Sequence, residues 1–226
     1  MKSLQAIIFD FDGVIANSEP LHLRAFQQAL GDEGLFLSAD EYYTRYLGFD
    51  DVGTFQALSR DRRLAWSARQ VGQLVTRKGV TLQEMVHSGD VLFPGAGDFI
   101  RLAAAKVPIA IASGALGAEI RRTLEREQLA GLFAAVVAAE DTPVGKPAPD
   151  PYLRALVLLS EATGARVAAS ECVAVEDSPW GLQSARAAGM HTVAVAQTYE
   201  AATLDADIVI SSLGLLDLKA LEQLCR

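Results

Sequence analysis

The stretch IIFDFDGV, residues 7–14, decides how the rest of the chain is interpreted. Its first three residues are β-branched or aromatic, a composition typical of a strand that is buried on both faces. Asp10 follows at the carboxyl end of this predicted strand, where open α/β sheets bind their ligands. Asp12 comes two positions later, and two carboxylates so close together repel each other unless a cation lies between them. The stretch therefore predicts a metal site at the end of a first core strand.

A second interpretation of the same stretch is a β-hairpin. Asp12 and Gly13 form a dipeptide that is favoured in type I′ turns, and Asp is common in turns of every kind. Residues elsewhere in the chain have to decide between the two interpretations.

Length and composition narrow the class of protein. A chain of 226 residues is long enough for one full core, with or without an inserted domain. Its net charge of −8 argues against a general nucleic-acid binder. No apolar run approaches the roughly 20 residues that a membrane span needs, and two aspartates interrupt the N-terminal apolar stretch, so we expect no membrane segment and no signal peptide. The two cysteines, Cys172 and Cys225, make a disulfide framework improbable and favour a reducing cytoplasm.

Between about residues 18 and 87 the sequence has helical periodicity and no convincing strand. The pattern predicts four helices: one over 18–31, one over 38–47 that begins with a capping box of Ser38 and Glu41, one capped by Asp50 or Asp51, and one over 63–78 that ends at Gly79.

After residue 93, short apolar runs alternate with helical patterns. Strands are predicted at 107–112, 136–139, 173–175, 192–195 and 208–210, and the last helix at 213–224. Alternation of this kind predicts a parallel sheet with helices on both faces. The expected fold class is α/β, with a Rossmann-like parallel-sheet core (1–15 and 91–226) interrupted by an inserted helical cap subdomain (16–90).

Two of the predicted strand ends carry groups that suit phosphate. Ser113 and Gly114 precede a predicted helix, where a hydroxyl and a bare amide can bind an anion, although Ser is also an ordinary N-cap. Lys146 lies among four prolines between residues 143 and 151, which stiffen the loop that presents its charge. A solvated lysine is the alternative at that position.

A third strand end repeats the acidic pattern of the first. Glu176 and Asp177 follow the predicted strand at 173–175, although acidic residues also favour the first turn of a helix for electrostatic reasons. Asp10, Asp12 and Asp177 supply the hard oxygen ligands that Mg²⁺ prefers, and Ser113 and Lys146 supply the anion-binding half of the same site.

Together these motifs resemble those of the haloacid dehalogenase superfamily, over nearly the whole chain. The pattern DxDx(V/T) is present as DFDGV at 10–14, the Ser/Thr motif as Ser113, the lysine motif as Lys146 and the acidic motif as Glu176-Asp177. The cap at 16–90 is similar to that of the branch containing β-phosphoglucomutase and phosphoglycolate phosphatase.

The resemblance implies a role for each residue. Asp10 would attack phosphorus and form an aspartyl-phosphate, and Asp12 would act as general acid and base. Mg²⁺ would be held by Asp10, the Asp12 backbone carbonyl and Asp177, with support from Glu176. Ser113, Gly114 and Lys146 would bind the transferring phosphoryl group. Family members that are dehalogenases lack the second aspartate, so a phosphotransferase is favoured.

The resemblance also points to cap residues that would contact substrate. His22 matches a position that can face substrate, with a packed or surface histidine as the alternative. Lys78, with its neighbour Arg77, matches a basic pair that can do the same, with a solvated helix end as the alternative. Asp51 stands where the mutase has an arginine for the distal phosphate, which favours a phosphatase over a mutase. We therefore expect a cytoplasmic Mg²⁺-dependent phosphatase of a small phosphorylated metabolite. A sugar phosphomutase is the alternative, and a receiver-type phospho-acceptor domain is a distant non-enzymatic one.

Overall fold

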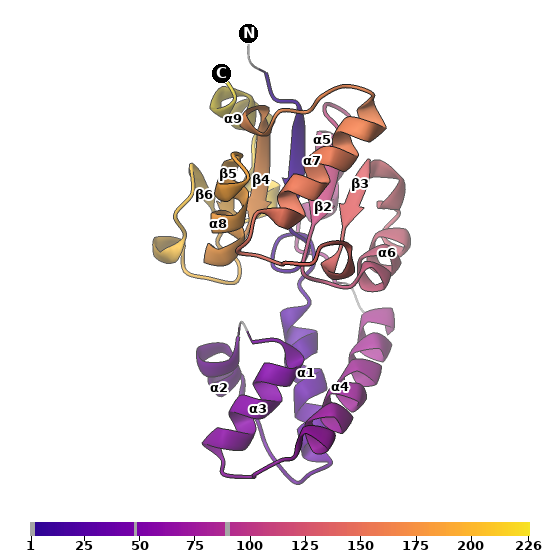
Figure 1. Ribbon diagram of the computed structural model, residues 1–226, viewed down its shortest axis with the longest axis vertical. Helices are drawn as coiled ribbons and strands as arrows, with labels where there is room; N and C mark the ends of the chain where they lie inside the picture. The colour runs from indigo at the N-terminus through magenta and orange to yellow at the C-terminus, as the bar shows by residue number, and fades with distance from the viewer. Residues whose placement is uncertain (1–2, 48, 89–90) are drawn as a thin grey trace. The chain divides into compact units, whose positions relative to one another are not determined.

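The computed structural model describes residues 3–47, 49–88 and 91–226, which form two compact units. The α/β unit comprises Met1–Asn17 and Val91–Arg226, and the helical unit comprises Ser18–Asp90 (Figure 1). The chain therefore leaves the α/β unit shortly after its first strand and returns to it after the helices.

A parallel sheet forms the centre of the α/β unit, in the order β3-β2-β1-β4-β5-β6. Every pairing within it is parallel, so the α/β class is confirmed and the hairpin interpretation of residues 7–14 is wrong. The strands are β1 (Ala6–Phe9), β2 (Ile109–Ala112), β3 (Ala135–Val137), β4 (Cys172–Glu176), β5 (His191–Val195) and β6 (Ile208–Ile210).

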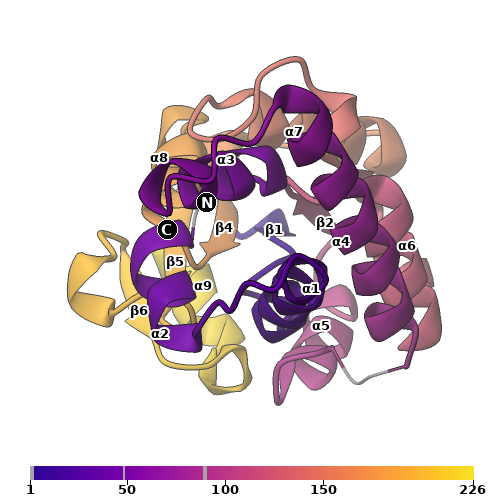
Figure 2. The ribbon, with the colours of Figure 1, turned by 90° about the horizontal axis from the view of Figure 1, so that it is seen from below.

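Both faces of the sheet are covered because the strand residues are apolar on both sides. Ile7 and Phe9 pack into one core layer with α5, α6 and α9, whereas Ala6 and Ile8 pack into the other with α7 and α8. Figure 2 shows α7 and α8 on one side of the strands and α5 and α9 on the other. These helices are α5 (Ala96–Ala104), α6 (Gly117–Arg126), α7 (Asp150–Thr163), α8 (Pro179–Ala187) and α9 (Leu218–Leu224).

The strand order places a topological switch point at β1. The chain passes from β1 to β2 to β3 on one side, then crosses back to β4 on the other. Phe9 is in register with Val175, and the Asp10 amide donates to the Val175 carbonyl at 2.9 Å. Asp10 is thus aligned with Glu176 at the carboxyl edge of the sheet, in the crevice where such folds bind ligands.

After β1 the chain makes a compact turn before it enters the helical unit. The amides of Ile15 and Ala16 both donate to the Phe11 carbonyl, and the Gly13 amide donates to the Ala16 carbonyl at 2.9 Å. Gly13 has φ +77°, which residues with a Cβ rarely adopt. The preference of Asp-Gly for turns is therefore realised locally, without a hairpin.

The helical unit contains α1 (Glu19–Gly31), α2 (Ala39–Glu41), α3 (Asp51–Asp61) and α4 (Ala68–Ser88). Ser38 accepts from the Glu41 amide and Asp50 accepts from the Gly53 amide, as their capping patterns predict. Beyond Glu41 the chain continues as a short π-helix, Tyr42–Tyr46, and the Glu41 carboxylate pairs with Arg62. The apolar faces of α1 and α3 pack against α4.

Three predicted helix boundaries were wrong. The predicted helix over 63–78 lies five residues too early, since Arg63 and Ala65 adopt positive φ before α4 begins. Gly79 does not end that helix, because an interior glycine costs only about 1 kcal/mol and tertiary packing offsets it. The helix predicted over 213–224 is a 3₁₀ turn followed by α9, which Asp217 caps.

None of the helices in the ranges that the structure describes combines the length and apolar composition required to cross a membrane.

Candidate active site

Asp10 occupies the centre of the carboxyl edge of the sheet. Its side chain is 11% exposed, and its Oδ1 accepts hydrogen bonds from the Phe11 amide at 2.7 Å and from Lys146 Nζ at 2.9 Å. Both donors hold the same oxygen. Oδ2 is therefore the oxygen available for a reacting atom or a cation.

Lys146 joins the two acidic strand ends. Its ammonium lies 2.6 Å from Glu176 Oε1 as well as 2.9 Å from Asp10, and 5.3 Å from the ring centre of Tyr152. The proline-rich loop that follows β3 carries it to this position, and the Ala148 carbonyl of that loop accepts a hydrogen bond from Ser184 of α8. Lys146 is thus a fixed cation within the site and not a solvated surface lysine.

Glu176 is completely buried, and both of its carboxylate oxygens have donors. Oε1 accepts from Lys146 and from the Tyr152 hydroxyl at 2.7 Å, while Oε2 accepts from the Ser178 hydroxyl at 3.1 Å and the Asp177 amide at 3.2 Å. Direct coordination of a metal by Glu176 would have to replace one of these contacts. A Cβ at Gly181 would overlap its carboxylate at 1.9–2.0 Å, so only glycine fits there.

The burial of this cluster changes its proton affinities. Burial raises the pKa of Asp10 to about 7, against the opposing effect of Lys146 and with a further increase from Glu176 and Asp12. Burial likewise raises the pKa of Asp177, and the neighbouring charges of Asp10 and Glu176 add to the increase. Burial lowers the pKa of Lys146, but Asp10 and Glu176 outweigh it and raise the pKa above its ordinary value. Negative charge is in excess at this edge of the sheet.

The arrangement of the acids suits a divalent cation. Among the described residues, Asp10, Glu176 and Asp177 each offer an oxygen, and these atoms lie within 4.8 Å of one another. Mg²⁺ prefers hard oxygen ligands such as carboxylates, and its charge would offset the excess of negative charge that these acids carry. Asp12 is partly exposed and close enough for its charge to raise the pKa of Asp10. The residues present therefore fit the magnesium ion predicted from the sequence.

Ser113 and Gly114 lie at the end of the neighbouring strand β2. Ser113 is buried, and its Oγ accepts from the Ala115 amide at 3.1 Å, which leaves its hydroxyl proton to donate elsewhere. Gly114 is exposed. The sequence predicted a helix directly after these two residues, but α6 begins only at Gly117. The Gly117 amide donates to the Glu140 carboxylate at 3.1 Å. The N-terminus of α6 is thus occupied by a carboxylate, and an anion at Ser113 would bind to the preceding loop.

The helical unit places His22 and Lys78 in contact with each other. Lys78 is 1% exposed, and its Nζ lies 2.7 Å from Asp51 Oδ1, 3.0 Å from His22 Nδ1 and 4.8 Å from the ring centre of Phe26. Burial, together with the Lys78 charge, lowers the pKa of His22 to about 3. His22 is therefore neutral and accepts from the ammonium, which Asp51 neutralises.

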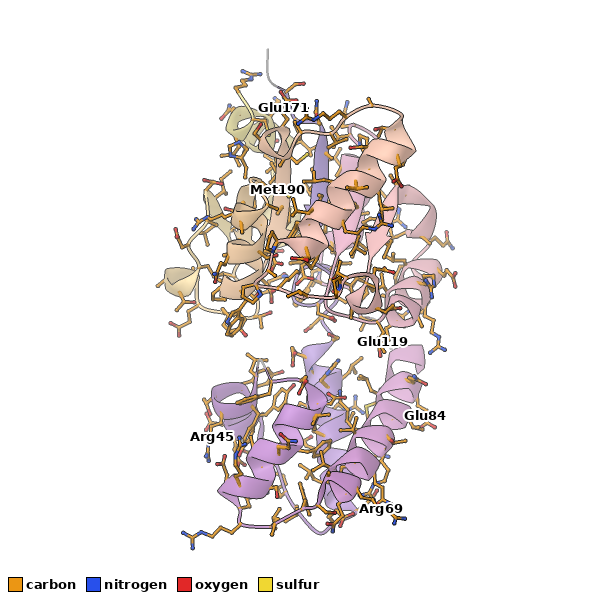
Figure 3. The ribbon with its side chains drawn as sticks, in the orientation of Figure 1. Arg45, Arg69, Glu84, Glu119, Glu171 and Met190 are labelled. Carbon is orange, nitrogen blue, oxygen red and sulfur yellow. The ribbon has the colours of Figure 1, made fainter. Side chains whose placement is uncertain are left out.

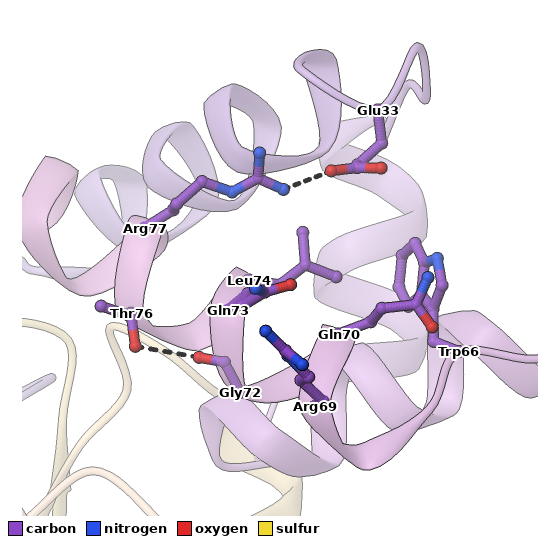
Figure 4. Close-up of a pocket in the computed structure, with 9 residues that line it drawn as sticks. All are labelled: Glu33, Trp66, Arg69, Gln70, Gly72, Gln73, Leu74, Thr76 and Arg77. Atoms are coloured by element: carbon purple, nitrogen blue, oxygen red, sulfur yellow. Dashed lines mark hydrogen bonds and ion pairs between the residues drawn. The ribbon is translucent and has the colours of Figure 1, made fainter.

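Arg77, the neighbour of Lys78, faces a different part of the helical unit. Its guanidinium pairs with Glu33 at 2.5 Å and borders a hollow of about 600 Å³ whose wall includes Trp66, Arg69 and Gln73 (Figure 4). The Arg69 side chain lies at the surface, as does that of Arg45 (Figure 3). Successive helical residues point in directions about 100° apart, so Arg77 and Lys78 do not act as one basic pair.

Four side chains at the α/β site were missed from the sequence. Tyr152 and Ser178 bind Glu176, Thr198 donates to the Asp177 carboxylate, and Gln197 Nε2 donates to the Gly13 carbonyl at 3.0 Å. Ser178 had a local signal, since it precedes Pro179 as an N-cap and accepts from the Gly181 amide. The other three had none, because their contacts join segments far apart in sequence.

The chain is similar to known proteins over most of its length. The sequence pattern of the family described as "Haloacid dehalogenase-like hydrolase" matches residues 7–195. The protein CbbY of Cupriavidus necator is 35% identical over 213 residues, which are 88% of this chain and 80% of that protein. The fructose-1-phosphate phosphatase YqaB of Escherichia coli is 31% identical over 198 residues, or 84% of this chain and 95% of that protein. The crystal structure of CbbY from Rhodobacter sphaeroides in complex with phosphate has a TM-score of 0.77 at 24% identity, covering 94% of this chain and 96% of that one, which shows the same fold.

Proposed function

The chain belongs to the haloacid dehalogenase-like hydrolase family and is a phosphatase of that family, and we propose that it hydrolyses a small phosphorylated sugar in the presence of Mg²⁺. One observation carries the proposal: Asp10, Lys146, Glu176 and Asp177 converge at the switch point of the sheet. A buried carboxylate there has one oxygen fixed by two donors and the other available for reaction.

In the first step, Asp10 Oδ2 attacks the phosphorus atom while the bond from phosphorus to the leaving oxygen breaks. Asp12 gives its proton to that oxygen, so the alcohol leaves neutral and the phosphoryl group remains on Asp10. In the second step, Asp12 takes a proton from water as the water oxygen attacks phosphorus. Inorganic phosphate forms and the Asp10 carboxylate is regenerated.

The phosphoryl group would be bound by Lys146 and by the loop of Ser113 and Gly114. Lys146 already has a fixed position between two carboxylates, so little reorganisation is needed when charge develops on the phosphoryl oxygens. Glu176 acts on the reaction through Lys146, which it orients together with Tyr152.

Asp10, Asp177 and the Asp12 backbone carbonyl would hold Mg²⁺, with Glu176 beside them. When bound, the ion supplies a Lewis acid that offsets the charge of the acids and of the phosphoryl group.

We propose that His22 and Lys78 contribute to the choice of substrate. Asp51 neutralises Lys78, which is 1% exposed, so the partly exposed His22 and Asp51 offer the hydrogen-bonding groups and the cluster has little net positive charge. A second phosphate would need an unpaired cation, whereas sugar hydroxyls can bind to a mixed set of donors and acceptors. The expected substrate is therefore a sugar monophosphate, which agrees with the fructose 1-phosphate named for the relative from Escherichia coli.

The decisive experiment measures phosphate release from a panel of sugar monophosphates and bisphosphates, with Mg²⁺ and with a chelator. We expect turnover of one or more monophosphates that stops when the metal is removed. Asp10→Asn should lower kcat on the order of 10³-fold or more. The exposed Asp98→Asn, which leaves the site intact, is the matched control. Full activity of Asp10→Asn would rule out the assigned nucleophile.

A mutase is the second candidate, since it would use the same nucleophile and metal. Glucose 1-phosphate supplied with a bisphosphate primer distinguishes the two reactions. We expect release of inorganic phosphate or no reaction, and sustained formation of glucose 6-phosphate would instead establish the mutase.

A further inference from the structure

The loop that follows β5 contacts the site at two points, although it carries none of the four sequence motifs. The Thr198 side chain donates a hydrogen bond to the Asp177 carboxylate, and Gln197 Nε2 donates to the Gly13 carbonyl at 3.0 Å. Asp177 follows β4 and Gly13 follows β1, so two consecutive residues of one loop each hold a different strand-end loop of the site.

Both contacts lie next to Gly13, and the space that a side chain would fill there is taken by Asp177 and Thr198. A Cβ on Gly13 would lie 1.8 Å from Asp177 Oδ2 and 2.7 Å from Thr198 Oγ1, distances at which atoms overlap. The φ of +77° at Gly13 is also a conformation that residues with a Cβ rarely adopt. The glycine therefore leaves room for the Asp177 carboxylate and the Thr198 hydroxyl to lie directly beside the turn that carries Asp12.

Asp177 differs from the other two acids in its partners. Lys146 makes ion pairs with Asp10 and Glu176, and Glu176 has the further support of Tyr152 and Ser178. The Thr198 hydroxyl hydrogen-bonds to the Asp177 carboxylate, and both groups border the same point, since a Cβ built on Gly13 would lie 1.8 Å from Asp177 Oδ2 and 2.7 Å from Thr198 Oγ1. A carboxylate that ligates a metal gains affinity when a neighbouring donor holds it in one rotamer.

We propose that Thr198 is a positioning residue for the cation site, which holds Asp177 in the rotamer that binds a divalent metal, and that Gln197 positions the Asp12 turn through Gly13. The inference rests on the proposed function only in taking Asp177 as a metal ligand. It assigns to the β5 loop a role in metal affinity and in proton transfer.

The test for Thr198 is a titration of the substrate-free protein with Mg²⁺ by calorimetry. Thr198→Val removes the hydroxyl at nearly constant volume and should weaken Mg²⁺ binding on the order of 10-fold. Thr198→Ser keeps the hydroxyl and should bind within about twofold of the unaltered protein. Thr203→Val is the matched control, since Thr203 lies in the same connection and donates only to the Glu200 carbonyl.

Kinetics supply a second readout for the same variants. For Thr198→Val, the Mg²⁺ concentration that gives half-maximal activity should rise about 10-fold, and kcat at saturating Mg²⁺ should largely recover. An unchanged Mg²⁺ affinity in Thr198→Val overturns the proposal. So does a loss of equal size in Thr198→Ser, because packing of the threonine methyl group would then be responsible.

Gln197→Met tests the second contact. The variant should keep its Mg²⁺ affinity and lose kcat, with a larger loss on a sugar phosphate than on p-nitrophenyl phosphate. The reason is that an alkoxide leaving group needs the Asp12 proton, whereas nitrophenolate leaves without one. Equal losses on the two substrates would contradict a role in proton transfer.

Failure of this inference can be told apart from failure of the proposed function. Mg²⁺ binding by the unaltered protein without hydrolysis of any sugar phosphate would contradict the function and leave the Thr198 measurement valid. Hydrolysis by the unaltered protein, with the same Mg²⁺ affinity in Thr198→Val, would contradict the inference alone.

Discussion

Lys146 Nζ lies 2.6 Å from Glu176 Oε1, and Glu176 is a completely buried acid at the end of β4. The same ammonium reaches Asp10 at 2.9 Å. One cation therefore bridges the acids of two adjacent parallel strands, and its removal would leave both carboxylates without a counter-charge.

Replacement of Lys146 by methionine should destabilise the α/β unit as well as abolish turnover. Breaking a buried ion pair by removing one partner costs about 3–5 kcal/mol, because the remaining charge is unpaired. Urea unfolding at pH 7 measures the change, and Lys106→Met, at an exposed lysine, should leave stability nearly unaltered. A Lys146→Met protein as stable as the parent would show that the bridge contributes nothing to folding.

His22 should make the helical unit less stable in acid. Its pKa is about 3 in the folded protein because of burial and Lys78, against about 6.5 when unfolded. Between about pH 3 and pH 6.5, His22 is therefore protonated in the unfolded state and neutral in the folded state. The stabilisation is therefore complete above pH 6.5, and it is lost as the pH falls, by about 2 kcal/mol at pH 5.

The measurement uses a Trp180→Phe background, in which Trp66 is the remaining tryptophan of the chain and reports on the helical unit. His22→Gln should flatten the dependence of the unfolding free energy on pH between 5 and 7. His191→Gln, in the α/β unit, should leave it as it was. A dependence that survives His22→Gln must come from another group.

Mg²⁺ should stabilise the folded protein against heat. A ligand that binds only the folded state adds about 2.7 kcal/mol at a concentration 100 times its Kd. The shift in Tm should disappear with a chelator and in Asp177→Asn. Asp205→Asn, at an exposed residue that pairs with Arg186, should keep the full shift. A metal-dependent shift that persists in Asp177→Asn would place the ion elsewhere.

Asp51→Asn should change which phosphate esters are preferred. The substitution removes the charge that neutralises Lys78, so the helical unit gains an unpaired cation. We expect the ratio of kcat/KM for fructose 1,6-bisphosphate to that for fructose 1-phosphate to rise several-fold. Asp40→Asn, at an exposed position, is the control. An unchanged ratio would show that the ion pair of Lys78 and Asp51 does not affect which substrate is preferred.

Much of the fold was predictable because its signals are local. The apolar runs of β1, β4 and β6 were short, β-branched and bounded by polar residues, and the structure has strands at those places. Gly79 misled the prediction of α4, since a glycine signals a helix end only when packing does not override it. Helix α5 was not predicted and was found only in the structure.

The sequence by itself determined the fold class and the acids at the strand ends, because a buried parallel strand and the polar residue after it are encoded within a few adjacent positions. Only the tertiary structure decided which groups meet Asp10, Glu176 and Asp177. The partners Lys146, Tyr152 and Thr198 come from loops and helices joined to those acids through the strand order alone. Their contacts depend on the order of the strands in the sheet and on the directions of the side chains, and a short stretch of sequence encodes neither.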